Sequence, residues 1–394
     1  MGKEIEVKTV VPTLRFPEFR GLIGWETKPL DNILYYERPD NYIVESEIYC
    51  DEGIPVLTAN KSFILGYTKE SNGICTNLPV IIFDDFTTDK KYVNFPFKVK
   101  SSAIKILRTR HSNVLRFIYE LMNQITFESK EHKRYYISVY QKIQVPLPKE
   151  KEQSKIADCL SSLDELIEST AQKVEILKDH KKALMQRLFP AEGKDVPEFR
   201  FPEFQGKKEW QRKQIKDLGE VITGNTPSKK EEKYWNGDFV WVTAQDFKGK
   251  YINDSILKLT KFGKDKARVI PKNSVLVTCI ASIGLNAINK VECSTNQQIN
   301  AICCNQEYNY EYMYYLVTYN TKNLKQLAGQ TAVPIITKKS FEDFEVYAIE
   351  NYDEQQKIAN CLSSLDELIE ATSRKVEILK EHKKGLMQQL FPKI

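Results

Sequence analysis

The feature that most constrains the fold is an internal repeat. Residues 152–190 and 354–392 align without gaps at an offset of 202, and 31 of the 39 paired residues are identical. A shorter marker, Arg-Phe-Pro-Glu-Phe, opens each half at 15–19 and 200–204, an offset of 185. Between marker and shared segment lies a variable domain of about 150 residues in each half. This order indicates duplication of one structural unit.

The shared segment has the periodicity of a long helix with one apolar face. Its apolar residues recur in alternating steps of three and four, the spacing of a coiled-coil seam. Thr170 and Lys181 interrupt the seam in the first copy, as Thr372 and Lys383 do in the second. The predicted apolar seam consists of Ile156, Leu160, Leu163, Ile167, Val174, Leu177, Leu184 and Leu188, and of Ile358, Leu362, Leu365, Ile369, Val376, Leu379, Leu386 and Leu390.

A helix with a single apolar face needs a partner, and its own copy is the simplest one. Parallel pairing would require the intervening domain to span a helix of about 57 Å. A domain of this size is only about 40 Å across. Antiparallel pairing removes the conflict, so we expect an intramolecular antiparallel coiled coil with approximate two-fold symmetry. Pairing between chains is the alternative.

The variable domains combine strand-like and helix-like segments. Strands are expected at 53–58, 79–83, 103–107, 239–243, 274–278 and 299–302, and helices at 114–124 and 310–328. The fold class is therefore α+β, with two mixed α/β domains separated by the repeat helices. The expected segments are a first domain at 1–150, the central helix at 151–190, a second domain at 191–351 and the distal helix at 352–394.

Composition excludes several classes of protein. Hydrophobic residues make up 41% of the 394 and charged residues 28%, which is typical of a folded chain. Without a long apolar run or a signal sequence, we expect a cytoplasmic location and no membrane contact. The eight cysteines form no C-x-x-C pair, so we expect reduced thiols and no metal site. The net charge of +5 permits DNA binding without requiring it.

No catalytic constellation is present, so we expect no catalytic residues in this chain. Phosphate-binding and dinucleotide-binding glycine motifs are absent. The run 94–97 resembles the N-P-P-[YF] methyltransferase motif, but its second residue is wrong. Asp84 and Asp85 could hold a metal, but a turn after a strand explains them as well, and His180 and His382 fit a solvated helix surface. Two domains without catalytic apparatus favour recognition over chemistry.

Polar and aromatic loops supply the candidates for recognition. Asn and Gln can pair with adenine edges, and basic-aromatic stretches suit a nucleic-acid backbone. The candidates for DNA contact are Thr58, Asn60, Lys61, Lys130, Lys133, Arg134, Tyr135, Lys229, Lys230, Tyr234, Thr243, Gln245, Asn296, Gln297, Gln298, Gln330 and Thr331.

Together these features resemble the specificity subunit of type I restriction–modification systems. The resemblance rests on the marker leading to Trp25 or Trp210, the turn at 224–227, the Thr-Asn-Gln-Gln stretch at 295–298 and the Glu-Gln-x-Lys-Ile-Ala opening of each repeat. It covers nearly the whole chain. The first domain lacks both the Gly-x-Thr-Pro turn and the Thr-Asn-Gln-Gln stretch.

The resemblance implies a non-catalytic subunit that binds double-stranded DNA. Each domain would be a target-recognition domain that reads half of a bipartite, asymmetric site. The helices would hold two modification subunits, which methylate adenine with S-adenosylmethionine after flipping it from the stack. Restriction subunits would add ATP- and Mg2+-dependent translocation and cleavage. The alternatives are a methylation-only system and, from a different class, a coiled-coil adaptor that binds proteins.

Overall fold

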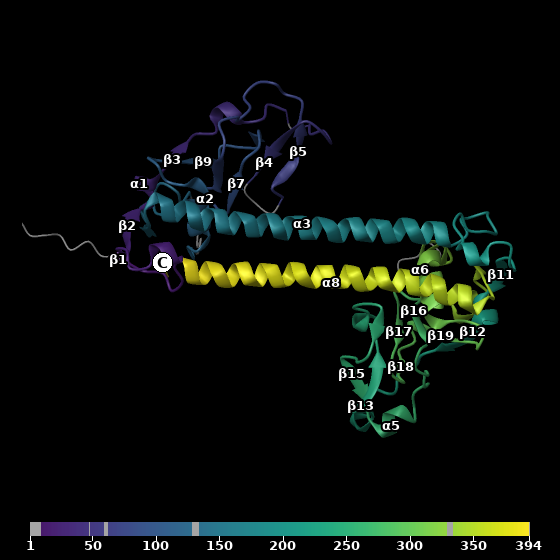
Figure 1. The fold of residues 1–394 in the computed structure, drawn as a ribbon. Helices are drawn as coiled ribbons and strands as arrows, with labels where there is room; N and C mark the ends of the chain where they lie inside the picture. Colours follow the sequence, from purple (N-terminus) through teal and green to yellow (C-terminus); the bar gives the residue numbers. More distant parts are fainter. Residues whose placement is uncertain (1–8, 47, 59–61, 128–133, 329–333, 394) are drawn as a thin grey trace, which may run out of the picture. The chain divides into compact units, whose positions relative to one another are not determined.

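The chain forms two compact units. The computed structural model describes residues 9–46, 48–58, 62–127, 134–328 and 334–393. The first unit comprises residues 1–171 with 374–394, and the second comprises 172–373. Each contains one mixed domain and a part of both long helices, α3 (Glu150–Leu188) and α8 (Tyr352–Leu390) (Figure 1). The boundary between the two units falls inside both long helices. The division into four segments expected from the sequence remains a prediction.

Within each unit α3 and α8 pack together and run antiparallel. In the first unit Lys383 reaches Asp164, with Nζ 2.7 Å from both carboxylate oxygens. In the second unit Lys181 reaches Asp366 at 2.5 Å. In the first unit Trp25 contacts both Glu152, near the start of α3, and Phe391, just after α8, so the helices run in opposite directions. In the second unit Tyr312 contacts both Phe189, just after α3, and the amide of Ile349, just before α8. The predicted pairing of the two repeats within one chain, and the α+β class, are confirmed.

The seam positions lie between the helices and the domains. Ile156, Leu160, Val174 and Leu188 are buried, as are their second-copy counterparts, and the remaining apolar seam residues are half-buried. The polar interruptions have partners of their own. The hydroxyl of Thr170 donates to the carbonyl of Leu166 at 2.6 Å, and Thr372 does the same one repeat later. Satisfied hydroxyls remove most of the cost of burying a polar side chain.

The described residues of the first domain form three small sheets and two α-helices. In the first sheet β2 (Trp25–Pro29) lies between β1 (Thr9–Val10) and β10 (Gln144–Leu147). The second has the order β3 (Leu34–Glu37), β9 (Ile104–Thr109), β6 (Val80–Asp84), β7 (Lys90–Val93), and the third has the order β5 (Ile64–Thr68), β4 (Ile54–Leu57), β8 (Lys98–Val99). The helices are α1 (Leu30–Ile33) and α2 (Leu115–Asn123).

The second domain repeats this plan with an added edge strand. Strand β11 (Gln211–Gln214) pairs with β20 (Glu345–Ala348). The large sheet has the order β12 (Gly219–Thr223), β19 (Ile299–Cys304), β16 (Val275–Thr278), β17 (Asn286–Asn289), β14 (Tyr251–Ile252), and the outer sheet has the order β15 (Leu257–Leu259), β13 (Trp235–Val242), β18 (Ser294–Thr295). The helices are α4 (Ile215–Leu218), α5 (Lys261–Lys264), α6 (Tyr310–Gln326) and α7 (Lys338–Glu342).

The strands and helices expected from the sequence are present to within a few residues. What the sequence did not reveal is the common topology of the two domains, because their residues between marker and repeat are unrelated. Every strand of the first domain except β1 has a counterpart in the same sheet position of the second domain, where β14 is the added strand. Both outer sheets also contain one parallel pair, β4 with β8 and β13 with β18.

Each domain has two hydrophobic cores divided by its central sheet. Along β6, Ile81 and Phe83 face the core that includes the helices, and Val80 and Ile82 face the outer sheet. Strand β16 divides its residues in the same manner. Alternate residues of a strand point to opposite faces, so a strand between two cores is apolar throughout. The outer core therefore sets the position of the loops that leave β4, β8, β13 and β18.

Candidate nucleic-acid interface

The parallel pair in the second domain places two predicted DNA-contact segments side by side. Trp241 pairs with Ser294, and Val242 pairs with Thr295. Parallel strands end at the same edge of a sheet, so Thr243 and Asn296 leave that edge together. Gln245 follows in a short 3-10 turn, and Gln297 and Gln298 follow Asn296. We call this edge of the second domain, with residues 224–230, 243–245 and 296–298, the second loop cluster.

The Gly-Asn-Thr-Pro turn is fixed against this edge. The hydroxyl of Thr226 donates to Oε1 of Gln297 at 2.6 Å, and the indole of Trp241 donates to the carbonyl of Asn225 at 3.2 Å. Gly224 lies so close to β18 that an added Cβ would be 2.0 Å from Oγ1 of Thr295. Only glycine fits such a backbone approach. The turn thereby carries the exposed Lys229 and Lys230 to the cluster.

A further loop reaches the same place. The amide of Cys279 donates to the carbonyl of Gln298 at 2.7 Å, and the amide of Ala281 donates to the carbonyl of Pro334 at 3.0 Å. Two candidates, Gln330 and Thr331, lie outside the described residues. Pro334, which follows them in the sequence, bonds to Ala281, and the same segment bonds to the cluster through Cys279 and Gln298.

The side chains of the cluster divide into those that shape loops and those that remain accessible. Asn296 and Gln298 bond to each other at 3.1 Å. Thr243 and Asp246 form a reciprocal capping box, in which the carboxylate accepts from the Thr243 amide at 2.7 Å. Gln245 and Gln297 are exposed. Tyr234, at the end of the 3-10 turn just before β13, is half-buried.

The first domain has an equivalent edge, of which the sequence indicated Thr58 as the match of Thr243 but not the segment that follows β8. Leu57 pairs with Val99 in parallel, and the amide of Lys100 donates to the Leu57 carbonyl at 3.0 Å. The second domain repeats this bond between Asn296 and Val242 at 3.3 Å. Residues 100–103 are therefore the counterpart of 296–298, with one residue more. We call this edge, with Thr58 and residues 100–103, the first loop cluster.

The match extends to the end of the loop. The amide of Asp85 donates to the carbonyl of Ala103 at 3.0 Å, as Cys279 does to Gln298. The sequence Lys-Ser-Ser-Ala shares no letters with Asn-Gln-Gln, so no motif search could pair them. The available signal was a short polar run between two strand-like segments.

The remaining first-domain candidates have different surroundings. Tyr135 is 4% exposed, and its ring lies 5.2 Å from that of Phe127. Arg134 is exposed, with its guanidinium 5.9 Å from the ring of Phe86. Thr58 is half-buried. The candidates Asn60, Lys61, Lys130 and Lys133 lie outside the described residues.

The acidic pair after β6 has a structural role. The carboxylate of Asp84 accepts hydrogen bonds from the amides of Phe86 and Thr87 at 2.9 and 2.8 Å, which closes a turn. Asp85 accepts from the Tyr136 amide at 2.8 Å. The described residues contain no group of three or more potential metal ligands. Within the same residues, no helix is both long and apolar enough to cross a membrane.

Burial makes several cysteines poor nucleophiles. All eight thiols are free. Burial raises the pKa of Cys279 and of Cys293 to about 12. Since the thiolate is the reactive form, both groups are unreactive at neutral pH. These thiols pack within the hydrophobic interior of the second domain.

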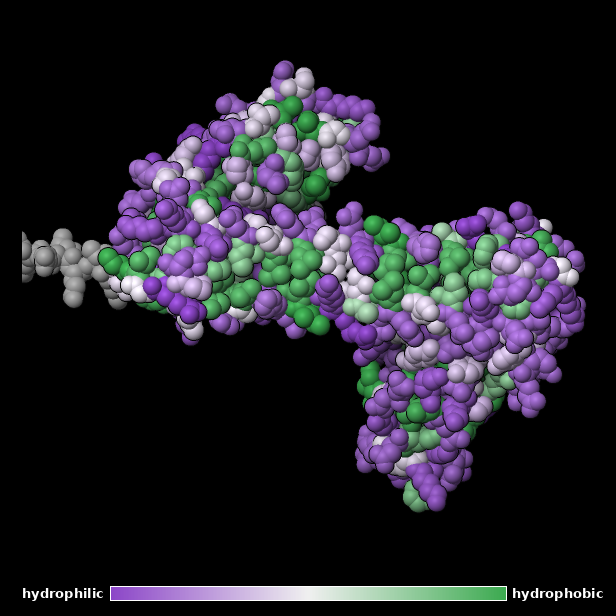
Figure 2. Space-filling view, in the orientation of Figure 1, coloured by the Kyte–Doolittle hydropathy of each residue, from purple (hydrophilic) through white to green (hydrophobic). Residues whose placement is uncertain are grey.

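The paired helices form a second candidate surface, for proteins. Leu166 and Ile378 in the first unit are 44% and 64% exposed, and Leu368 and Ile176 in the second are 43% and 61% exposed. These residues are the same two repeat positions in each unit. Figure 2 shows hydrophobic surface over the long helices. Apolar side chains that recur with the repeat suit a partner that binds twice in the same manner.

Comparison with known proteins assigns the family. A family model described as the type I restriction modification DNA specificity domain matches residues 23–178 and 207–381. The EcoR124I/EcoR124II specificity subunit of Escherichia coli is 31% identical over 390 residues, covering 93% of this chain and 94% of that protein. The MjaIX specificity subunit of Methanocaldococcus jannaschii is 35% identical over 191 residues, covering 47% of this chain and 44% of that protein.

Solved structures agree on the fold. The type I restriction–modification S subunit from M. genitalium matches with a TM-score of 0.66 at 16% identity, covering 98% of this chain and all of that one. A chain from a structure of the type I R-M system matches with a TM-score of 0.56 at 16% identity, covering 94% of this chain and 98% of that one. The chain therefore belongs to the family of type I restriction–modification specificity subunits, and it is the DNA specificity subunit of such a system.

Proposed function

We propose that the two loop clusters read the two different halves of one bipartite, asymmetric DNA site. The observation that carries this proposal is that both domains hold their loops with the same backbone hydrogen bonds but place different side chains on them. Lys100, Ser101 and Ser102 in one domain correspond to Asn296 and Gln297 in the other. A shared frame with different side chains would present two unlike patterns of donors and acceptors to base edges.

The proposal can be tested by selection from randomised DNA duplexes. The full chain, assembled with its modification partner, should enrich two short motifs separated by a fixed spacer. Exchange of residues 12–150 for another such domain should change one motif and leave the other intact. A change in both motifs, or enrichment of one continuous motif, would contradict the assignment of one half-site to each domain.

Individual loops can be tested in the same selection. Asn296→Ala with Gln297→Ala should relax base preference in one half-site, because each well-paired base contact contributes about 1–3 kcal/mol of discrimination. Ser101→Ala with Ser102→Ala should relax the other half-site. Lys272→Ala, on an exposed turn before β16, is the matched control and should change neither motif.

For partners, we propose that two modification subunits bind the repeated helix surfaces. Leu166→Glu should weaken binding of one subunit, Leu368→Glu should weaken the other, and the double variant should bind neither. Native mass spectrometry would count the subunits. Leu163→Glu and Leu365→Glu, at half-buried seam positions, should disrupt the helix pair itself. Two bound subunits in the Leu166/Leu368 double variant would rule out this surface.

The partner subunits would supply the chemistry and its cofactors. S-adenosylmethionine would bind the modification subunits, and ATP with Mg2+ would bind the restriction (translocase and nuclease) subunits, all in the cytoplasm. Calorimetry should detect S-adenosylmethionine binding to the assembled complex but not to this chain alone. A methylation-only system would not cleave unmethylated DNA in the presence of ATP. A cleavage assay on the assembled complex therefore separates it from a full restriction system.

A further inference from the structure

Each repeat carries the same aspartate, and both aspartates lie where a domain meets the helix pair. Asp164 and Asp366 occupy equivalent repeat positions, and each pairs with the repeat lysine of the opposite helix, Lys383 or Lys181. The repeat thus offers the same acceptor to two domains that differ in sequence. We call Asp164 and Asp366 the anchor aspartates.

The first domain supplies an arginine to its anchor aspartate. Arg116 on α2 forms an ion pair with Asp164 and another with the buried Glu120, at 2.7 Å. Its guanidinium also lies 5.0 Å from the ring of Tyr92. A planar guanidinium can serve both carboxylates and an aromatic ring at once.

In the second domain the equivalent position carries the opposite charge. The start of each domain helix is fixed by the repeat: the amide of Val114 donates to Oε1 of Gln153 at 2.9 Å, and that of Asn309 donates to Gln355 at 2.7 Å. When the two domain helices are aligned so that Val114 matches Asn309, Arg116 corresponds to Glu311. By the same offset, Glu120 corresponds to Tyr315. A direct copy of the first contact would place a second acid close to Asp366.

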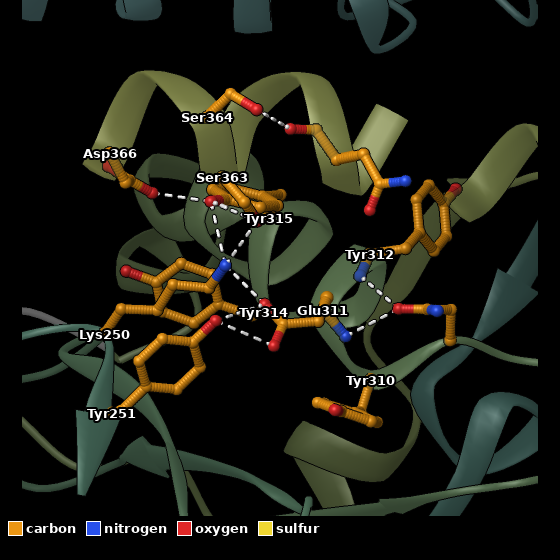
Figure 3. A network of polar contacts seen from close by, with 12 residues as sticks. Lys250, Tyr251, Tyr310, Glu311, Tyr312, Tyr314, Tyr315, Ser363, Ser364 and Asp366 are labelled. Atoms are coloured by element: carbon orange, nitrogen blue, oxygen red, sulfur yellow. Dashed lines mark hydrogen bonds and ion pairs between the residues drawn. The ribbon is translucent and has the colours of Figure 1, made fainter. Parts of the chain in front are cut away.

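Lys250 resolves this charge conflict (Figure 3). It reaches from the segment before β14 and forms an ion pair with Glu311, and its Nζ lies 2.7 Å from Oγ of Ser363 on α8. It also donates to the hydroxyl of Tyr315 at 3.0 Å, and that hydroxyl donates to Asp366 at 2.5 Å. Lys250 therefore connects the sheet, α6 and α8 at one point.

The environment of Lys250 shows that it is held tightly. Its side chain is 9% exposed, and three tyrosine rings lie within 5.5 Å of Nζ. Burial lowers its pKa, and the ion pair with Glu311 opposes that shift. Burial also raises the pKa of Tyr315, so its hydroxyl stays protonated and remains a donor to Asp366. A buried lysine with this many partners has one orientation available.

We infer that Arg116 and Lys250 are positioning residues, which fix each target domain in its orientation on the paired helices through the anchor aspartates. The inference rests on the proposed reading of one half-site by each domain. A domain that rocks on its helices would still offer the same side chains to bases. It would, however, tolerate a wider range of distances to the other half-site, so the predicted effect is on spacer length.

The experiment is the duplex selection on the full chain with its modification partner, performed on Lys250→Met, Lys250→Arg and the control Lys272→Met. The wild-type protein should enrich one spacer. Lys250→Met should keep both half-site motifs while its preference for that spacer over spacers one base pair longer or shorter falls about tenfold, the equivalent of one charge-assisted hydrogen bond. Lys250→Arg should restore much of the preference, and Lys272→Met should retain it.

The possible outcomes separate the two proposals. If the wild-type protein enriches no bipartite motif, the proposed function fails first. If it enriches one and Lys250→Met selects the same spacer as sharply, the positioning role is wrong. A uniform loss of enrichment by Lys250→Met, without a change in spacer preference and without rescue by Lys250→Arg, also overturns it. Should Lys250→Met fold poorly in a thermal melt, Arg116→Lys applies the same test to the first domain.

Discussion

The two units anchor their domains to identical helix residues by contacts that match in part and differ in part. At the start of the helices, Arg15 bonds to Glu152 with two nitrogens at 2.8 and 2.7 Å, and Arg200 bonds to Glu354 with two at 2.8 Å. The indole of Trp25 adds a third bond to Glu152 at 3.1 Å. The buried indole nitrogen of Trp210 has no partner among the described residues.

The ends of the helices show the same pattern. Phe391 packs edge-on against Trp25 at 6.3 Å, and Phe189 packs edge-on against Trp210 at 5.9 Å. The next ring differs: Phe117 in the first unit and the stacked Tyr312 in the second. The arginine–glutamate and tryptophan–phenylalanine contacts between marker and repeat are thus preserved in both units, and the residues of the variable domains adapt to them. The difference shows that the repeat presents the same residues in both units, and that each domain contacts them with side chains of its own.

The largest effect should come from removing the marker arginines. Both arginines pair with carboxylates that are at most 3% exposed, so an unpaired charge would remain in the interior. Arg15→Met and Arg200→Met should each cost about 3–5 kcal/mol of unfolding free energy. Arg200→Met should cost more, because Glu152 keeps the indole of Trp25 as a donor. Urea denaturation would measure both.

The matched control is Arg212→Met. Its ion pair with Glu345 is 65% and 42% exposed on the two sides, so the expected loss is under about 1 kcal/mol. Equal losses for Arg15→Met and Arg200→Met would show that the Trp25 bond contributes nothing to stability. The attachments at the starts of α3 and α8 would then be energetically equivalent.

A smaller effect is expected at the turn that only the second domain has. Gly224→Ala would force its methyl group into Thr295 and the Asn296 carbonyl, at a cost of about 1–3 kcal/mol. The second half-site should lose base preference while the first is unchanged in the duplex selection. Wild-type stability and unaltered preference in this variant would mean that the turn does not fix the second loop cluster.

The anchor aspartates should show a still smaller effect. Their side chains are 34% and 27% exposed, so solvent screens their ion pairs. Asp164→Asn and Asp366→Asn should each cost about 1 kcal/mol or less. Asp164→Asn should cost more, since it separates two cations from their carboxylate, and Asp366 pairs with one cation and a hydroxyl. Paired thermal melts would rank them, and the reverse order would contradict the view that the Tyr315 hydroxyl holds Asp366 less strongly than Arg116 holds Asp164.

The smallest effect concerns chemical reactivity. Because burial raises the pKa of Cys279 and Cys293 to about 12, iodoacetamide at pH 8 should modify these thiols after the half-buried Cys159 and Cys361. Mass spectrometry of a labelling time course gives the order. Early labelling of Cys279 in the folded protein would indicate that the interior of the second domain opens.

The long helices were predictable because their information is local and repeated. Ile156 and its seam partners follow one period as far as Leu188, and the copy at 354–392 identifies the partner. The shared topology of the domains depended on pairings distant in sequence, such as Leu57 with Val99, which no local pattern encodes.

The candidate site was predictable only in part, for the same reason. The stretch at 296–298 became a candidate because it has a recognisable motif, and its structural counterpart at 100–103 did not because it has none. Tyr135 fitted a basic-aromatic pattern, yet it lies in the interior, since an aromatic ring suits a core as well as a surface. Lys250 stood out in no motif, because its partners come from α6 and α8.

The loops at residues 100–103 and 296–298 are fixed at both ends by main-chain amides and carbonyls, which do not depend on the side chains between them. Amino-acid identity there is therefore only weakly tied to foldability. Substitutions at these positions can change base preference while the strands beneath stay unaltered. A descendant protein can therefore recognise a different DNA sequence without a change in its fold.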